Sequence, residues 1–271
     1  MALSKLIGFF LCLRSLLCPC GLEPETWPRS HAQYEVQHVG QLALLESSGL
    51  APGDAAGQYY TLQDGGNAAA LFRFLPSGQI TDTLGFAGRN RDWEALADSP
   101  DGTLYIGDVG NNADWRSQFH IFALRSVRTD TLHLYYPAQS QQPDLRHTQW
   151  DAEGLYYSND SLTLFGKARR RDDTHVYRIP DEAGEHALVP HQSFRLRGQI
   201  TGADINPSGT EVAALAYGKI YFFGVAPNGK LTPQHCFYWP FNGQAEAILY
   251  LADDRLLVTN EAGKVWEVRR K

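Results

Sequence analysis

The chain has 271 residues, of which 43% are hydrophobic and 20% are charged. This composition supplies enough apolar material for a large core and excludes an intrinsically disordered chain. The formal net charge of -6 argues against a nucleic-acid partner, because binding to a polyanion requires clustered Lys and Arg over a broad face.

The first twenty residues differ in character from the rest of the chain. An apolar stretch from Leu6 to Leu17, interrupted by Arg14, follows a basic start, which is typical of a secretory signal. The stretch is shorter than the roughly 20 apolar residues that cross a bilayer. We therefore expect residues 1–20 to be a signal peptide or export segment without a membrane span, and the protein to be secreted or periplasmic. Cys20, which precedes a glycine, leaves a lipid anchor in the cell envelope as an alternative.

Beyond residue 40 the sequence has the pattern of antiparallel β-structure. Short runs rich in aromatic and β-branched residues, such as 103–108, 162–167 and 219–225, are separated by turn pairs such as Asp101-Gly102 and Asn228-Gly229. Such pairs supply the positive φ that tight hairpins require. We expect an all-β domain.

Five segments of this domain can be aligned with one another. Their central positions are Ser48, Glu94, Glu153, Thr201 and Glu246, and each is followed by Gly or Ala. The spacings are 46, 59, 48 and 45 residues, and about 45 residues make one four-stranded propeller blade. A small residue is expected where the innermost strands crowd around the axis. The repeat predicts a five-bladed β-propeller, with six blades as an alternative; a pair of β-sandwiches would not explain the period.

The last repeat is one strand short. The chain ends after a third strand, and the segment 34–45 precedes the first repeat. We expect this segment to supply the outer strand of the last blade and so remove a free sheet edge. The propeller domain is therefore predicted over 34–271, with a linker over 21–33.

The propeller topology predicts which polar residues meet. The start of each first strand lies at the same face as the loop between the second and third strands, because consecutive strands are antiparallel. The loops should bring to this mouth Asp64, Asn67, Asp108, Asn111, Asn112, Arg116, Lys167, Tyr217, Asn260 and Glu261. With period-two alternation, Glu46, Asp92 and Asp151 should face the same way as the central positions two residues later.

Several carboxylates around one narrow channel repel one another, so they must protonate, pair with cations or hold a metal. An all-oxygen set containing Glu94, Glu153 and Glu246 suits calcium better than zinc. Two alternatives stay open. The carboxylates could bond the backbone of neighbouring blades, with Lys167 and Arg116 balancing the charge, or Glu94 or Glu153 could act directly as an acid or base.

The segment 92–112, DWEALADSPDGTLYIGDVGNN, is the most specific part of a resemblance that covers roughly 45–262. It resembles a group of uncharacterised secreted bacterial β-propeller proteins. More distantly, the arrangement is similar to calcium-dependent propeller hydrolases, the calcium-activated nucleotidases and the phytase-like esterases. That similarity implies a central cation held by acidic residues of the inner strands. Ser48 and Thr201 depart from an all-acidic ring.

These observations predict an exported propeller that binds calcium and a small polar or anionic molecule at an acidic channel mouth. As an enzyme it would be a metal-assisted hydrolase of a phosphoester or lactone, with Asp64 or Asp108 positioning water. The other residues expected to bind the ligand are Asn67, Asn111, Asn112, Arg116, Lys167 and Glu261. The alternative is a non-catalytic propeller module that binds a ligand or a protein.

Overall fold

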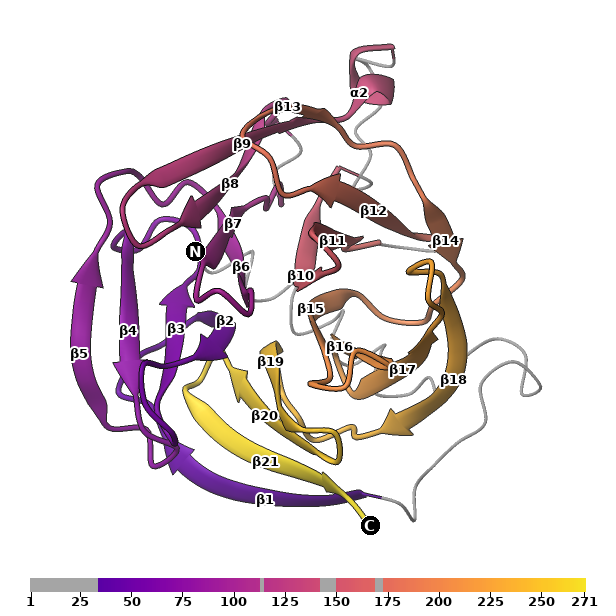
Figure 1. Cartoon of the computed structure of the whole chain (residues 1–271). Coiled ribbons are helices and arrows are strands. Elements are labelled where there is room, and N and C mark those ends of the chain that lie inside the picture. Colours follow the sequence, from indigo (N-terminus) through magenta and orange to yellow (C-terminus); the bar gives the residue numbers. More distant parts are fainter. Residues whose placement is uncertain (1–33, 113–114, 142–149, 169–172) are drawn as a thin grey trace.

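The strands form five sheets arranged around one axis (Figure 1). The computed structural model describes residues 34–112, 115–141, 150–168 and 173–271. The predicted export segment and linker, residues 1–33, lie outside the described residues. Among those described, no helix is long and apolar enough to cross a membrane. The prediction of an all-β, five-bladed propeller is confirmed, and the six-bladed alternative is wrong.

Each blade places its first strand innermost and its fourth outermost. Blade 1 contains β2 (Ser47–Pro52), β3 (Tyr59–Gln63), β4 (Ala70–Phe74) and β5 (Ile80–Gly85). Blade 2 contains β6 (Trp93–Asp98), β7 (Leu104–Asp108), β8 (Phe119–Leu124) and β9 (Thr129–Tyr135), followed by the short helix α2 (Pro137–Gln141). Blade 3 contains β10 (Ala152–Ser158), β11 (Ser161–Gly166), β12 (Thr174–Pro180) and β14 (Gln192–Phe194). Blade 4 contains β15 (Ile200–Ile205), β16 (Glu211–Ala216), β17 (Lys219–Val225) and β18 (Leu231–Tyr238). Blade 5 contains β19 (Ala245–Ala252), β20 (Arg255–Asn260), β21 (Lys264–Arg270) and the N-terminal strand β1 (Tyr34–Gln41).

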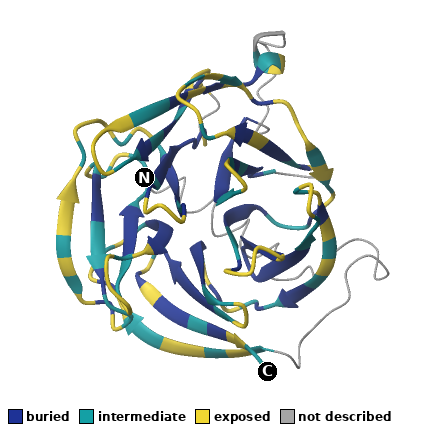
Figure 2. Cartoon of the chain, in the orientation of Figure 1, coloured by how far each residue is buried: buried dark blue, intermediate teal, exposed yellow. Residues whose placement is uncertain are grey.

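The hydrophobic core is divided into five clusters, each between two neighbouring blades. The inner strands are buried along most of their length, whereas outer strands such as β5 are largely exposed (Figure 2). Intermediate strands alternate: β8, with the sequence FHIFAL, buries every second residue. This alternation follows from the period of two along a strand whose faces contact different neighbours.

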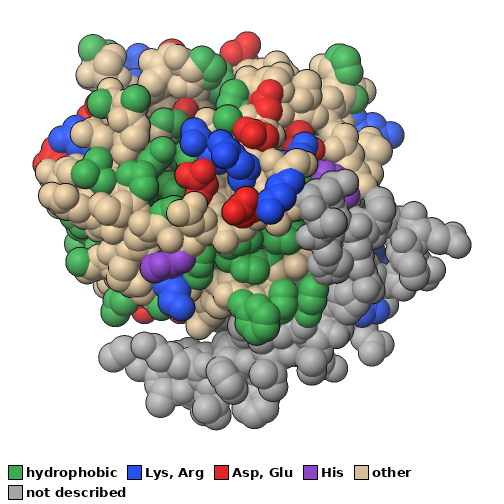
Figure 3. Space-filling view, turned by 90° about the horizontal axis from the view of Figure 1, so that it is seen from below, with side chains coloured by type: hydrophobic (Ala, Val, Ile, Leu, Met, Phe, Trp, Pro, Cys, Tyr) green, Lys and Arg blue, Asp and Glu red, His purple; other side chains and the backbone are tan. Residues whose placement is uncertain are grey.

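Two strands pair with partners that lie far from them in the sequence. β1 pairs antiparallel with β21, with Tyr34 opposite Arg270, so the predicted closure of the last blade is confirmed. β13 (Gly184–Ala187) leaves blade 3 and pairs in parallel with β9 of blade 2, which makes that sheet five-stranded. From the side on which β1 and β21 lie, the surface carries side chains of both charges next to one another (Figure 3). Mixed charge on outer strands disfavours pairing with another sheet.

A β-bulge marks the repeated central position in every blade. The pairing of each innermost strand with its second strand shifts by one residue at the five positions Ser48, Glu94, Glu153, Thr201 and Glu246. A bulged residue is left out of the ladder and its side chain is re-aimed. The five residues that align in the sequence repeat are therefore also the five bulge residues of the structure.

The small residue after each bulge is required by the crowding at the axis. A Cβ atom on Gly49 would lie 2.6 Å from the backbone nitrogen of Leu96 in the next blade. A Cβ atom on Gly202 would lie 3.0 Å from the carbonyl oxygen of Glu246. The repeated Gly or Ala thus allows the innermost strands to approach one another closely.

Candidate functional site

The starts of the innermost strands and the ends of the second strands lie together at one mouth of the channel. Trp93 pairs with Asp108 in blade 2, and Ala152 pairs with Gly166 in blade 3. The residues that follow the second strands, including Asp64 and Lys167, therefore lie beside the bulges.

Three carboxylates from blades 1 and 2 form the tightest acidic group of this mouth. One oxygen from each of Asp64, Asp92 and Glu94 lies within 4.8 Å of the other two. Glu94 is only 4% exposed, and its Oε1 is buried without a hydrogen-bond partner among the described residues. An unpaired buried carboxylate oxygen is costly. The group therefore has unused capacity to accept a cation or a donor.

Two glycines make room for this group. A Cβ atom on Gly65 would lie 2.5 Å from Oδ1 of Asp92, and one on Gly110 would lie 2.6 Å from Cγ of Asp92 and 2.7 Å from Cγ of Glu94. Neither glycine has a positive φ. Their role here is close approach rather than turn geometry. The two glycine-containing loops thus form a cradle around Asp92.

The pKa values of these carboxyls are raised. Burial, followed by the charges of Asp64 and Asp151, raises the pKa of Asp92 to about 7. Burial also raises the pKa of Asp64, although a hydrogen bond from the amide of Gly65 opposes the rise. Burial and the charges of Asp64 and Glu153 raise the pKa of Glu94 well above its usual value. Desolvation and like charge both disfavour the ionised forms, and a bound cation would relieve both.

Blades 3 to 5 balance their carboxylates internally. Lys167 donates a hydrogen bond to Glu153, and the hydroxyl of Tyr217 donates to Oε1 of Glu246 at 2.6 Å. The Lys167 ammonium also lies 5.8 Å from the centre of the Tyr217 ring. Burial acts to lower the pKa of Lys167, but the surrounding acidic groups, led by Glu153, together outweigh it and raise that pKa. At the rim, Gln244 donates to Oε1 of Glu261 at 2.7 Å.

The five bulge residues divide by chemistry into two sets. The hydroxyl of Ser48 donates to the carbonyl of Trp93, and the hydroxyl of Thr201 donates to the carbonyl of Ala245. Each of these bonds joins one blade to the next. The three glutamates instead each keep one buried oxygen without a partner in the described part of the chain: Oε1 of Glu94, Oε2 of Glu153 and Oε2 of Glu246. The hydroxyls therefore connect blades, whereas the glutamates do not: Glu153 and Glu246 bond Lys167 and Tyr217 through their other oxygen.

The polar side chains at the end of β7 and in the loop after it bond one another and the backbone of that loop. Arg116 pairs with Asp108 at 3.0 Å and donates to the carbonyls of Gly110 and Asp108. The Asn111 side chain accepts from the amide of Arg116 at 3.0 Å. Asp108 and Arg116 are 1% and 4% exposed. The structure thus places these three predicted site residues in a brace behind the mouth, whereas Asn112 is exposed to solvent.

The three carboxylates that lie two residues before the central positions differ in their partners. Asp92 joins the acidic group of blades 1 and 2, but Asp151 accepts from the amide of Asn111 at 2.7 Å. Glu46 has a positive φ of 61° and accepts from the side chain of Asn67 at 2.9 Å. An equivalent place in the repeat therefore does not give these three carboxylates the same partners. Only Asp92 belongs to the candidate cation group.

Beneath the mouth the channel narrows to a small cavity of about 10 Å3, room for about one water molecule. Glu153 and Glu246 line it together with Leu50, Leu96 and Leu155. The apolar side chains follow the bulges along the inner strands, so the mouth is polar and the channel below it is apolar.

No protein-family model and no curated protein matches this sequence. Solved structures do match. One is the PQQ-bound aldose sugar dehydrogenase of Streptomyces coelicolor, with a TM-score of 0.55 and 13% identity, over 89% of this chain and 99% of that chain. A putative gluconolactonase matches with a TM-score of 0.52 and 13% identity, over 92% of this chain and 97% of that one. A putative glucose dehydrogenase of Thermus thermophilus matches with a TM-score of 0.52 and 10% identity, over 88% and 100%. At these identities the likeness establishes the propeller fold alone.

Proposed function

We propose that the mouth binds one calcium ion through Asp64, Asp92 and Glu94. The observation that carries the proposal is the buried, unpartnered Oε1 of Glu94 beside two further carboxylates. Calcium binds oxygen ligands at about 2.4 Å, so ligands on opposite sides of the ion lie about 5 Å apart. Carboxylate oxygens within 4.8 Å of one another can therefore contact the same ion. This set keeps Glu94 from the sequence prediction and replaces Glu153 and Glu246, which Lys167 and Tyr217 engage.

We further propose that the protein is a metal-assisted hydrolase of small polar lactones. A bound divalent cation would polarise the carbonyl oxygen and lower the pKa of a bound water. Lys167 supplies a positive charge on the other side of the mouth, where it can donate to the oxygen on which negative charge develops. It donates one side-chain hydrogen bond, to Glu153, so further donor capacity remains.

The charge of the mouth favours a lactone over a phosphate ester. Among the described residues, Lys167 is the cationic side chain at the acidic group, because Arg116 is engaged behind it. A phosphate monoester brings about two negative charges near neutral pH, which this mouth would repel, whereas a lactone is neutral. The putative gluconolactonase among the structural neighbours supports placing sugar lactones first in a substrate panel.

Calcium binding is tested by calorimetric titration and thermal melts in calcium and in chelator. We expect saturable binding and a higher melting temperature with calcium, because a ligand that binds only the folded state stabilises it. Glu94→Gln should abolish both effects. Glu35→Gln, an exposed change on β1, should leave them intact. Equal melting with and without calcium would refute the cation site.

Activity is tested separately by following the hydrolysis of lactones and phosphate esters with calcium present. We expect lactone turnover that chelator and Glu94→Gln both abolish. Calcium binding without turnover of any substrate would refute the hydrolase and favour the binding-module alternative, while leaving the metal site in place.

A further inference from the structure

A row of polar side chains crosses one face of the sheet of blade 2. Asp108 on β7 pairs with His120 on β8, and His120 pairs with His133 on β9. On the far side of β9, Glu185 of β13 pairs with His133. Directly paired residues point to the same face of a sheet. Four groups that can ligate or orient a metal ion therefore lie side by side on four adjacent strands.

The two histidines have the spacing of two ligands of one ion. Their ring centres are 5.3 Å apart, and their ring planes are inclined at 80°. Zinc binds an imidazole nitrogen at about 2.1 Å, so a ring centre lies about 3.2 Å from the ion, and two rings at the tetrahedral angle have centres about 5.2 Å apart. His120 and His133 can therefore hold the same ion without a change in the backbone.

Asp108 leaves one nitrogen of His120 for the ion. Nδ1 of His120 lies 3.5 Å from Oδ2 of Asp108, and Arg116 holds that same carboxylate at 3.0 Å. The strand order β9-β8-β7 places Asp108 and His133 on opposite sides of His120. Nε2 is therefore the nitrogen available to a metal, in the carboxylate–histidine–metal arrangement that fixes the orientation of a ligand.

His133 and Glu185 have no competing polar partner. Both are exposed, and neither forms a hydrogen bond or ion pair with another described residue. Adjacent strands lie about 4.8 Å apart, so the Glu185 side chain can turn toward an ion bound to His133. Imidazole and carboxylate donors together suit zinc, whereas calcium prefers oxygen ligands. This set is therefore chemically distinct from the carboxylates of the mouth.

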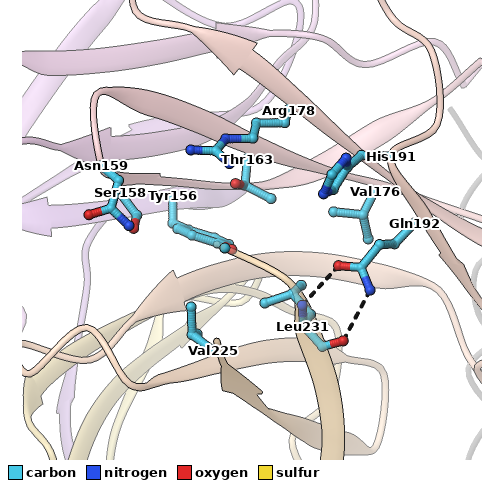
Figure 4. A pocket seen from close by; sticks show the side chains of 11 residues that line it. Tyr156, Ser158, Asn159, Thr163, Val176, Arg178, His191, Gln192, Val225 and Leu231 are labelled. Carbon is cyan, nitrogen blue, oxygen red and sulfur yellow. Dashed lines mark hydrogen bonds between the residues drawn. The ribbon is translucent and has the colours of Figure 1, made fainter. Parts of the chain in front are cut away.

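An ion at this place would hold β13 on blade 2. The strand has four residues, pairs in parallel and buries none of them, and Figure 1 shows it at the outer edge beside β9. No side chain of Gly184–Ala187 bonds blade 2 within the described ranges. The next strand, β14, is tied to blade 4 directly, because Gln192 donates to the carbonyl of Leu231 at 3.0 Å and accepts from its amide at 2.8 Å (Figure 4). Among these two strands, β13 is the one that a shared ion would stabilise.

We propose that His120, His133 and Glu185 bind one zinc ion, which fastens β13 of blade 3 to the sheet of blade 2. Asp108 is a positioning residue, which orients His120 and does not touch the ion. Water completes the tetrahedral coordination.

Binding is tested by calorimetric titration of zinc into the full chain, with calcium in excess to occupy the mouth and with free thiols blocked beforehand. We expect saturable binding in the micromolar range. His120→Gln and His133→Gln should each weaken it at least tenfold. The double variant should lose less than the product of the two single losses, because both histidines hold the same ion. Absence of saturable zinc binding, or unchanged binding in both single variants, would overturn the site.

The matched control is His38→Gln, which removes an exposed histidine on β1 of blade 5 and should leave zinc binding unchanged. An equal loss of binding in His38→Gln would indicate adventitious binding at surface histidines and would refute the proposal. Thermal melts in chelator should be the same for His133→Gln and the parent protein, since the exposed imidazole has no described polar partner.

Hydrogen exchange tests whether the ion fastens β13. Zinc should slow exchange of the amides of Gly184–Ala187 in the parent protein, because opening of the strand would then require loss of a ligand. Glu185→Gln should weaken zinc binding and abolish this protection. Protection that zinc confers equally on Glu185→Gln and on the parent would overturn the role of Glu185, and zinc binding without any protection of β13 would overturn the fastening.

Discussion

Asp92→Asn should make the calcium-free protein more stable at alkaline pH. The pKa of Asp92 is raised from 3.8 to about 7. Because the folded-state pKa lies above the unfolded one, the stability that the protonated carboxyl contributes is complete below about pH 4 and is lost as the pH rises to about 7. The neutral amide does not suffer this loss.

The size of the pKa shift of Asp92 determines how much stability Asp92→Asn should gain. About three pKa units correspond to about 4 kcal/mol at pH 8, and partial exposure of Asp92 reduces this. We expect a gain of about 2 kcal/mol in the free energy of unfolding. No described hydrogen bond to the Asp92 carboxyl is lost in the amide, since the contact with Asp108 uses the Asp92 backbone nitrogen.

The assay is urea unfolding in chelator at pH 4, pH 6 and pH 8, followed by tryptophan fluorescence. The gain of Asp92→Asn over the parent protein should increase with pH. Asp254→Asn, an exposed change on blade 5, serves as the control and should show no such trend. With saturating calcium at pH 8 the order should reverse, because only the parent protein keeps its full ligand set. A gain that is absent at pH 8, or equally large at pH 4, would refute the account of a repulsive, cation-seeking site.

Two further changes test the packing around the channel. Lys167→Met leaves the Glu153 carboxyl without its buried partner and should lower the free energy of unfolding by about 3 kcal/mol; Glu153→Gln added to it should restore most of this, and urea unfolding of both variants checks it. Tyr34→Ala on the closing strand removes a ring stacked 4.7 Å from Phe237 and a 2.6 Å contact with His235. It should cost about 3 kcal/mol, and a melting temperature within a degree of the parent would contradict the role of β1 in holding blade 5 to blade 4.

The propeller could be predicted from the sequence because the same packing requirement recurs in every blade. Each blade needs a small residue where the inner strands meet, and Gly49, Ala95, Gly154, Gly202 and Ala247 fulfil that need at similar spacings. The bulge that precedes each of them has no comparable compositional signal. Simple alternation predicts that Asp92 and Asp151 face the same way, and it does not reveal that Asp151 accepts from the amide of Asn111 while Asp92 lies beside Asp64 and Glu94.

The composition of the site depends on which loop side chains are already bonded within their own loops. Asp108 and Arg116 have the residue types of a ligand site, yet they satisfy each other and the backbone of their own loop. Sequence alone does not distinguish a buried brace from a free binding group. The pairing of β13 with the sheet of blade 2 depends on contacts between blades, which no single blade encodes.

The pairing of β1 with β21 also determines the order in which the blades form and the ring closes during synthesis. Of the described strands, β1 comes first in the sequence and β21 last, so β1 cannot pair until β21 has been made, and four blades can form before the ring closes. Until Lys264–Arg270 has left the exit tunnel, two sheet edges remain unpaired, and this interval is when association with another nascent chain is most favourable.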